Sequence, residues 1–393
     1  MEALRLVWDE SFTRYDFGVG HPMSPVRLDL TARLARDLGL LAHAGVQVVG
    51  AEPAPDDLLL TVHRPEYVAA VRRSSVPPFP RDEECGLGTE DVPVFEGMHD
   101  ASARIVAGTV DVALAVWSGQ ATHGVNFTGG MHHAMPGRAS GFCVYNDTAV
   151  AIRAVLDAGA ERVAYVDVDV HHGDGVEHIF WDDPRVLTVS LHETGRVLVP
   201  GTGYPHEIGG PNAEGNAVNV AFPPGTSDAG WLRAFHAVVP PLVTAFRPQV
   251  LFTQHGCDSH AQDPLAHMAL SLDGQVESYR ALHELAHDVA DGRWVAVGGG
   301  GYELVDVVPR AWSHLVGIAA HHPIEPTAEV PQSWREYVVE ALGRPSPHRM
   351  TDGRELWYRS WATGHDPENA VDRAVMATRK AVFPLHGLDP WFD

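Results

Sequence analysis

Lysine is almost missing from this sequence, and cysteine is scarce. Lys380 is the only lysine, so arginine carries nearly all the positive charge. The three cysteines, Cys85, Cys143 and Cys257, are odd in number and form no CxxC pair, which argues against a disulfide framework or a thiolate zinc site. The sequence also has neither a basic segment followed by an apolar stretch near its start nor an apolar run approaching membrane-spanning length. We therefore expect a protein of the reducing cytoplasm.

Positive charge is in short supply overall. The chain has 28 Lys and Arg against 51 Asp and Glu, a net charge of -23 over 393 residues. Such a surface repels phosphate backbones and anionic lipid headgroups, so nucleic acid and membrane surfaces are not expected partners. The negative electrostatic potential of the same surface favours a cationic substrate, such as a lysine-bearing peptide or a polyamine. With 45% apolar and 20% charged residues, the composition is that of a globular protein.

No internal repeat or low-complexity linker divides the sequence, and its predicted elements alternate. Short β-branched runs predict strands at 125–128, 162–170, 186–192, 250–255 and 294–297. Helical patterns lie at 101–117, 147–156, 228–246, 275–289 and 302–320. This alternation predicts an α/β fold, with a parallel sheet covered by helices on both faces. We expect one large catalytic domain over residues 1–320 and a C-terminal extension over 321–393, with a helix at 370–383, packed on it.

The densest group of chemically active residues lies at 166–175, which reads Val-Asp-Val-Asp-Val-His-His-Gly-Asp-Gly. Alternation with a period of two puts Asp167, Asp169 and His171 on one face of a strand end, where two carboxylates and an imidazole can meet one cation. The flanking valines predict a buried strand, and unpaired buried carboxylates are costly. The stretch therefore favours a metal site over a solvated acidic pair.

Asp258 follows a second apolar run, 250–257, and so stands at an equivalent place. Because parallel strands end at the same edge of a sheet, Asp258 can complete a site with Asp169 and His171. One histidine and two carboxylates with open positions describe a catalytic metal site, since structural zinc sites are usually closed and rich in thiolates. Oxygen-rich ligation suits zinc and ferrous iron, and we expect zinc.

Two adjacent histidines, His132 and His133, follow two glycines just past a short strand. The glycines permit a close approach of the backbone to a ligand. A surface turn is the alternative in a chain with 24 histidines. Asp167 and Asp174 are available as partners, however, and an imidazole oriented by a carboxylate is the usual general base or electrostatic catalyst. We therefore predict a catalytic role for the pair.

Four glycines at 298–301 precede Tyr302. A glycine run can cradle a phosphate, but no GxGxxG pattern follows and no Walker lysine is present. A flexible loop that places Tyr302 over the metal fits better, because a phenol can donate to an oxygen that becomes negative in the transition state.

Taken in order, these motifs resemble those of the zinc-dependent histone deacetylase family, which has the arginase-deacetylase fold. The motifs are Gly-Gly-Met-His132-His133-Ala, Asp167-Val-Asp169-Val-His171-His172-Gly-Asp174-Gly, Gln-His-Gly-Cys-Asp258 and Gly-Gly-Gly-Gly-Tyr302. The stretch 15–27 is similar to that of class I-like members. Residues 88–95 and the long tail most resemble the bacterial acetoin-utilisation deacetylases. The resemblance covers roughly residues 1–320 and implies a single large parallel-sheet domain.

The resemblance implies a role for each matching residue. The zinc ligands would be Asp169, His171 and Asp258. The catalytic residues would be His132, His133, Asp167, Asp174 and Tyr302, with Asp167 behind His132 and Asp174 behind His133. The substrate-binding residues would be Arg27, Asp91, Gly141, Phe142 and Val199. A structural K⁺ would be held, largely by backbone carbonyls, at Asp167, Asp169, His171, Ser190 and Leu191.

Within the substrate-binding set, Gly141 and Phe142 match the acyl-lysine tunnel, Asp91 the carboxylate at its rim, and Arg27 an internal channel. Val199 departs from the pattern, because the family often has an aromatic residue before Pro-Gly-Thr-Gly. If Val199 faces Phe142 across the tunnel, the tunnel is wider and acyl groups longer than acetyl fit.

Together with the resemblance, these features predict a zinc-dependent amidohydrolase that removes acetyl groups, and also longer acyl groups if the tunnel is wide, from lysine side chains of proteins or peptides. The likeness to acetoin-utilisation deacetylases implies a metabolic target such as an acyl-CoA synthetase. An acetylpolyamine amidohydrolase is the main alternative. A non-catalytic acyl-lysine binder would require neither Tyr302 nor two His-Asp pairs, and an arginase-like enzyme would require more carboxylates for two manganese ions. The sequence carries no signal for the oligomeric state.

Overall fold

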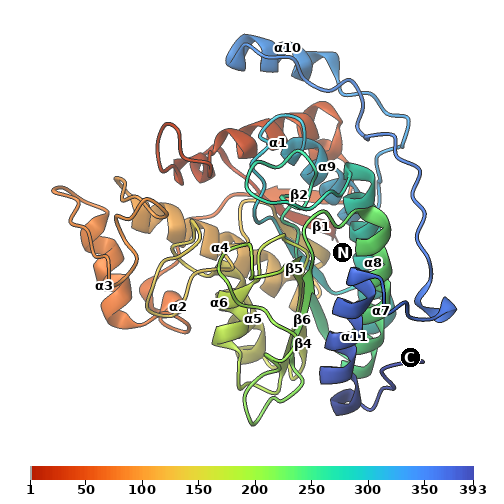
Figure 1. Ribbon diagram of the computed structural model, residues 1–393. Helices are drawn as coiled ribbons and strands as arrows, with labels where there is room; N and C mark the ends of the chain where they lie inside the picture. Colours follow the sequence, from red (N-terminus) through yellow and green to blue (C-terminus); the bar gives the residue numbers. More distant parts are fainter. Residues whose placement is uncertain (1) are drawn as a thin grey trace.

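A parallel β-sheet forms the centre of the molecule. The computed structural model describes residues 2–393, and its eight strands follow the order β2-β1-β3-β8-β7-β4-β5-β6, with every neighbouring pair parallel. Helices cover both faces of the sheet (Figure 1). This arrangement confirms the predicted α/β architecture and is consistent with the arginase-deacetylase fold that the resemblance implies.

The elements have the following bounds. The strands are β1 Glu2–Val7, β2 Val46–Val49, β3 Ala121–Asn126, β4 Val163–Asp167, β5 Val186–Glu193, β6 Ala217–Phe222, β7 Val250–Gln254 and β8 Trp294–Val297. The helices are α1 Val26–Asp37, α2 Asp56–Leu59, α3 Pro65–Ser74, α4 Met98–Trp117, α5 Asp147–Asp157, α6 Asp174–Ile179, α7 Asp228–Phe246, α8 Leu272–Ala290, α9 Val308–Ala319, α10 Gln332–Leu342 and α11 Ala370–Val382. Short 3₁₀ turns are η1 Glu10–Arg14, η2 Leu40–Ala42, η3 Trp361–Thr363 and η4 Phe383–His386.

Strands β4 and β7 are buried along their whole length. Helices cover both faces of the sheet at this place, so the sequences of β4 and β7 are apolar except near their carboxyl ends. The strand predicted at 162–170 is too long, because β4 ends at Asp167. Beyond it, the N–H groups of Asp169 and His171 donate to the side chains of Asp167 and Asp169 at 3.0 and 2.9 Å. These carboxylates replace the neighbouring strand as hydrogen-bond partners, so the chain leaves the sheet.

Two layers of helices enclose the sheet. Helix α4 packs on β3 and against α5, whereas on the other face α9 packs between α1 and α8, followed by α7 and α11 (Figure 1). The helix predicted at 302–320 is too long at its start, since α9 begins at Val308. Gly299 and Gly301 have φ values of 138° and 150°, which no helix accommodates, and Pro309 stands in the first turn of α9, where its missing N–H costs nothing.

Four neighbouring strands, β3, β8, β7 and β4, place the predicted chemistry at one edge. Their carboxyl ends lead into the loops 127–133, 298–302, 255–258 and 168–173, respectively, and Asp174 begins α6 directly after the last of these. Loops at the carboxyl edge of a parallel sheet are where such folds bind ligands. We call this part of the molecule the catalytic edge.

The C-terminal residues 321–393 run along the outside of the helices (Figure 1). Helix α10 lies on α1, where the Trp334 indole N–H donates to the Leu30 carbonyl at 2.9 Å. Helix α11 packs on β6 and α7, and Arg233 forms a two-pronged ion pair with Asp372 at 2.7 and 2.8 Å. The domain boundary at residue 320 stays a prediction. Among the described helices, none combines the length and apolarity that a membrane crossing requires.

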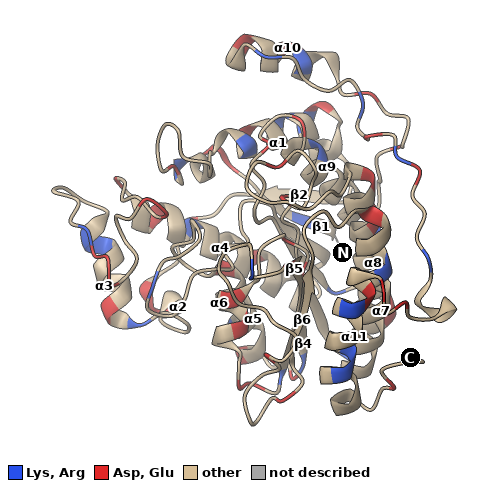
Figure 2. Ribbon diagram, viewed as in Figure 1, with Lys and Arg blue, Asp and Glu red and all other residues tan. Residues whose placement is uncertain are grey.

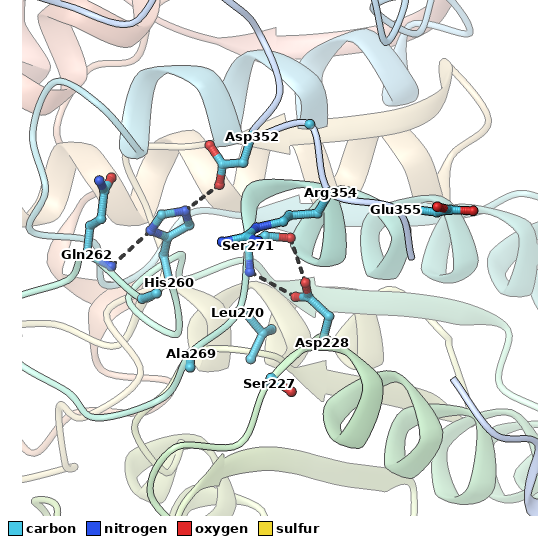
Figure 3. A pocket seen from close by; sticks show the side chains of 12 residues that line it. Ser227, Asp228, His260, Gln262, Ala269, Leu270, Ser271, Asp352, Arg354 and Glu355 are labelled. Atoms are coloured by element: carbon cyan, nitrogen blue, oxygen red, sulfur yellow. Dashed lines mark hydrogen bonds and ion pairs between the residues drawn. The ribbon is translucent and has the colours of Figure 1, made fainter. Parts of the chain in front are cut away.

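A surface pocket of about 530 Å³ lies where this C-terminal segment meets the loops after β6 and β7. Figure 3 shows Asp352 pointing toward His260, whose Nε2 lies 2.8 Å away, while Asp228 accepts from Ser271. Arg310 of α9 donates to the other oxygen of Asp352 at 2.9 Å. Asp352 therefore fastens the segment to two parts of the main body.

Candidate active site

The predicted metal ligands meet at the catalytic edge. Ligand atoms of Asp169, His171 and Asp258 all lie within 4.8 Å of one another, and all three side chains are buried. His171 Nδ1 is 3.0 Å from Asp258 Oδ2 and 3.2 Å from Asp169 Oδ1. Asp169 and His171 reach this point from the loop after β4, and Asp258 from the loop after the neighbouring β7. The cluster is thus assembled from two adjacent loops rather than from one face of a strand.

The electrostatics of this cluster suit a cation. Burial and the charge of Asp169 raise the pKa of Asp258 to about 6. Although burial opposes it, the imidazoles of His132 and His171 hold the pKa of Asp169 well below its usual range. Among the ion pairs of residues 2–393, neither carboxylate is matched by arginine or lysine. Two buried carboxylates and one imidazole, with no arginine or lysine among their ion-pair partners in residues 2–393, fit a divalent cation with open coordination positions.

The glycine run at 298–301 packs directly on these carboxylates. A Cβ atom on Gly300 would lie 1.9 Å from Asp258 Oδ2, so no other residue fits without displacing the loop or the ligand. The Gly300 N–H donates to Asp169 Oδ2 at 2.7 Å. The glycines therefore let their own backbone approach the predicted metal ligands closely, and the Gly300 N–H orients Asp169. These contacts do not form a phosphate-binding loop.

Two His-Asp pairs flank the metal cluster. His132 Nδ1 lies 2.8 Å from Asp167 Oδ2, and His133 Nδ1 lies 2.6 Å from Asp174 Oδ1. The two imidazole centroids are 4.0 Å apart. Each Nδ1 faces a carboxylate, so each ring directs its Nε2 away from its partner.

The two imidazoles have opposite proton affinities. Despite burial, Asp167 and Asp169 raise the pKa of His132 to about 9. Burial and the neighbouring His132 lower the pKa of His133. At neutral pH the pair thus holds its proton on His132, while His133 is able to accept one.

Tyr302 lies in the loop between β8 and α9. Its N–H donates to Asp263 Oδ2 at 2.8 Å, and its ring meets that of Phe142 edge-on with centroids 5.7 Å apart. Burial and the charges of Asp258 and Asp169 raise the pKa of the phenol well above its usual value. The hydroxyl therefore stays protonated and can donate a hydrogen bond.

Arg27 holds the glycine loop 298–301 that precedes Tyr302. Its guanidinium donates to the carbonyls of Gly299 and Gly301 at 2.9 and 3.1 Å, and it stacks over the Trp312 ring at 5.1 Å. A narrow internal cavity adjoins it, lined in part by Tyr15. The loop-holding contacts of Arg27 were not foreseen from the sequence.

A short loop carries the predicted tunnel residues. Phe142 has φ 64°, a left-handed conformation that non-glycine residues rarely adopt, and its carbonyl accepts from the Tyr15 hydroxyl at 2.6 Å. The Gly141 N–H donates to the exposed Asp91 at 2.7 Å. A Cβ on Gly141 would lie 2.2 Å from the ring of His133. The structure thus brings Asp91, Gly141 and Phe142 together beside the His-Asp pairs.

The remaining predicted residues differ in burial. Val199 is 70% exposed, whereas its neighbour Leu198 is 7% exposed. Ser190 and Leu191 are buried in β5, where Ser190 lies opposite Asp167 in the strand register. The roles of Val199 in the tunnel and of Ser190 and Leu191 in binding K⁺ stay predictions.

Sequence reasoning missed two carboxylates that position the site. Asp147 accepts from the N–H groups of Gly130 and Met131 and so fixes the loop before His132. Asp263 holds the backbone of Tyr302, as described above. Asp147 is the first residue of a helix, and Asp263 lies five residues after Asp258. Neither position in the sequence predicts which loop the carboxylate will contact.

Comparisons with known proteins agree with this geometry. A family model described as "Histone deacetylase domain" matches residues 21–319. The "Acetoin utilization protein AcuC" of Bacillus subtilis (strain 168) is 41% identical over 330 residues, which cover 84% of each chain. Proteins of the same name from Staphylococcus xylosus and Staphylococcus aureus (strain MSSA476) are each 37% identical, over 84% and 88% of this chain and 85% and 90% of theirs.

This chain belongs to the histone deacetylase family. The family match includes every residue placed at the catalytic edge, from Arg27 to Tyr302, and leaves the tail after residue 319 outside. As a histone deacetylase family member, the chain is a hydrolase of the deacetylase type. The resemblance identified from the four motifs is confirmed, including the likeness to acetoin utilization proteins.

Proposed function

We propose that this protein is a zinc-dependent lysine deacetylase that hydrolyses the amide of acetyl-lysine in proteins or peptides. The observation that carries the proposal is the convergence at one sheet edge of a cation-binding triad, two His-Asp pairs and the partly buried phenol of Tyr302. Binding alone would not require proton-transfer groups on both sides of the ligand. Membership of a deacetylase family supports amide hydrolysis as the reaction.

Asp169, His171 and Asp258 would hold the metal ion. Their donor set of one nitrogen and two oxygens suits Zn²⁺, with Fe²⁺ as the alternative. When bound, the ion would supply Lewis-acid polarisation of the amide carbonyl and a lowered pKa for the attacking water. A structural K⁺ at Asp167, Asp169, His171, Ser190 and Leu191 is part of the same proposal.

His133 accepts the proton of the attacking water at its Nε2, because its Nδ1 faces Asp174 and is held there. The Asp174 carboxylate stabilises the imidazolium that forms. His132, paired with Asp167, orients and stabilises the developing negative charge. A protonated imidazole then passes its proton to the departing lysine amine.

Tyr302 donates a hydrogen bond from its hydroxyl to the carbonyl oxygen as that oxygen becomes negative, and keeps its proton. The contacts of its backbone with Asp263 and of its loop with Arg27 hold the phenol in place before substrate binds. A donor positioned in advance costs little reorganisation in the transition state. Phe142 and Gly141 enclose the lysine stem, and Asp91 binds the substrate backbone at the rim.

The acidic surface supports a lysine-bearing substrate. Asp and Glu outnumber Lys and Arg by 51 to 28, and the basic residues are confined to short stretches such as those on α3 and α11 (Figure 2). The relatives' name, acetoin utilization protein, suggests a metabolic target, and we propose an acetylated acyl-CoA synthetase. The same charge also suits an acetylpolyamine, which remains the second candidate substrate.

The test is to compare kcat/KM for an acetyl-lysine peptide and an acetylated polyamine, using zinc-loaded and chelator-stripped enzyme. We expect turnover of the peptide that returns on addition of Zn²⁺. Faster hydrolysis of the polyamine would replace the protein substrate with the small one. Tight binding of the acetylated peptide without any turnover would contradict an enzymatic function.

A further inference from the structure

Four histidines meet at the opposite end of the strands from the catalytic edge. We call His123, His283, His287 and His321 the four-histidine cluster. His123 is the third residue of β3 and lies opposite Trp294, the first residue of β8. His283 and His287 lie on α8, and His321 follows α9. One ring nitrogen from each residue lies within 4.8 Å of the others.

The tautomer of His123 is fixed by its surroundings. Its Nδ1 lies 2.8 Å from the carbonyl oxygen of Ala319, and a carbonyl only accepts, so Nδ1 carries the hydrogen. Nε2 of this fully buried ring therefore offers its lone pair to the cluster. Metal-binding histidines are typically oriented in this way, with one nitrogen donating to a carbonyl and the other binding the ion.

Ordinary hydrogen bonds do not satisfy the cluster well. His287 Nε2 lies 3.2 Å from Nε2 of His123 and also 3.2 Å from Nε2 of His283. A single ring nitrogen has either one hydrogen or one lone pair, so it cannot make two well-directed hydrogen bonds at once. One cation among the nitrogens would satisfy every lone pair together.

The spacing also matches a metal site. Zinc binds imidazole nitrogen at about 2.0–2.1 Å in a tetrahedron, which puts neighbouring nitrogens about 3.3 Å apart. The two Nε2–Nε2 separations given above are both 3.2 Å.

We propose that the four-histidine cluster is a second metal site, which binds Zn²⁺ or a similar imidazole-preferring divalent ion. Four protein ligands fill a tetrahedral shell and leave no open position, so the site is structural rather than catalytic. This proposal is independent of the function proposed for the catalytic edge. It concerns different residues and the other end of the sheet.

The local sequence supports the assignment. His283 and His287 are four residues apart on α8 and therefore project from the same face of the helix. With Glu284 between them they form His-Glu-Leu-Ala-His, an HExxH pattern that binds zinc through both histidines in other proteins. In metalloproteases the glutamate of this pattern acts on an open position, which the four-ligand shell here does not provide.

The metal would tie three separate segments together. His321 has φ 54°, an uncommon conformation for a residue with a side chain, and its ring stacks on His123 with centroids 4.7 Å apart. Binding would thus join the start of the C-terminal segment to α8 and to the central strand β3. His287 and His321 are exposed, so an ion can reach them from solvent.

The test uses the full chain, stripped with a chelator and then equilibrated with Zn²⁺ alone. Asp258→Ala removes a ligand at the catalytic edge and isolates the second site. In this background we expect zinc to be retained and to raise the melting temperature. Adding His287→Gln or His321→Gln should weaken zinc binding by at least about tenfold and abolish the thermal shift.

His322→Gln is the matched control, because His322 is the exposed neighbour of His321 and stacks on His43 outside the cluster. It should leave zinc uptake and the thermal shift unchanged. Absorption of Co²⁺ in the Asp258→Ala background should show a four-coordinate nitrogen site. The proposal is overturned if the Asp258→Ala chain binds no zinc, or if His287→Gln and His322→Gln bind it equally.

Discussion

The catalytic edge and the four-histidine cluster both gather imidazoles, but they do so at opposite ends of the strands and with different partners. At the catalytic edge, buried carboxylates surround His171, and two further imidazoles face carboxylates of their own. The four-histidine cluster contains nitrogen donors alone and opens to solvent at two of its members. Two carboxylates and one imidazole would leave coordination positions open for chemistry, whereas four imidazole nitrogens would fill a tetrahedral shell. The difference indicates that donor type and number, rather than histidine content, separate a reactive centre from a structural one.

The largest expected effect comes from breaking the catalytic edge alone. Asp258→Ala should lower kcat/KM by about a thousandfold or more, because the transition-state charge loses several kcal/mol of stabilisation with the ion. The fold should persist, since the core does not depend on this ligand. Deacetylase assays, circular dichroism and metal analysis check this. Undiminished activity, or zinc uptake equal to that of the wild type, would show that the site is misplaced.

A smaller loss of activity is expected when the hydroxyl of Tyr302 is removed. Tyr302→Phe should reduce kcat by about a hundredfold or more and leave KM nearly unchanged, as for the loss of one transition-state donor. Tyr204→Phe, on a loop outside the cluster, is the control and should behave as the wild type. Steady-state kinetics on an acetyl-lysine peptide distinguish the two. A near wild-type kcat for Tyr302→Phe would remove this residue from the mechanism.

Acyl-chain preference should respond more modestly. If Val199 shapes the tunnel, the wild type accepts propionyl- and butyryl-lysine, and Val199→Phe restores a preference for acetyl of about tenfold. The measurement is kcat/KM for the three acyl groups in one peptide. A wild type already strict for acetyl, or an unchanged ranking in the variant, would assign the tunnel wall to another residue, with the buried Leu198 as the first candidate.

The smallest effect on catalysis is expected from the other end of the sheet. His287→Gln should keep kcat/KM within about twofold of the wild type, because distant sites act independently. Its melting temperature in zinc should fall below that of the wild type. If activity falls in proportion to the loss of zinc from the four-histidine cluster, the two ends of the sheet are coupled and the two sites do not act independently.

The sequence predicted the architecture because strand and helix patterns alternate clearly, and it predicted where Asp169 and Asp258 would meet because parallel strands share an edge. The sequence placed Asp169 and His171 on a strand, because the alternation with a period of two extends past Asp167. In the structure the strand ends at Asp167, and both residues lie in the loop that follows. The start of α9 was also misplaced, because positive φ values at the glycines cannot be derived from a helical pattern.

Long-range partners were the least predictable part. Arg27 meets carbonyls more than 270 positions away, and Asp263 meets a backbone N–H on another loop. The four-histidine cluster left one local trace, the pair His283 and His287. Its other two members come from a strand and a helix end that only the tertiary structure brings together.

The contact between Arg27 and the glycine loop also bears on when the enzyme becomes active during synthesis. Residue 27 leaves the ribosome early, but the carbonyls it holds belong to residues 299 and 301. The pairing of β3 with β8 likewise waits for residue 294. Partly made chains therefore lack a finished reaction centre, and closing such distant contacts is slow. The site at the catalytic edge is therefore incomplete until the glycine loop at 298–301 has been synthesised.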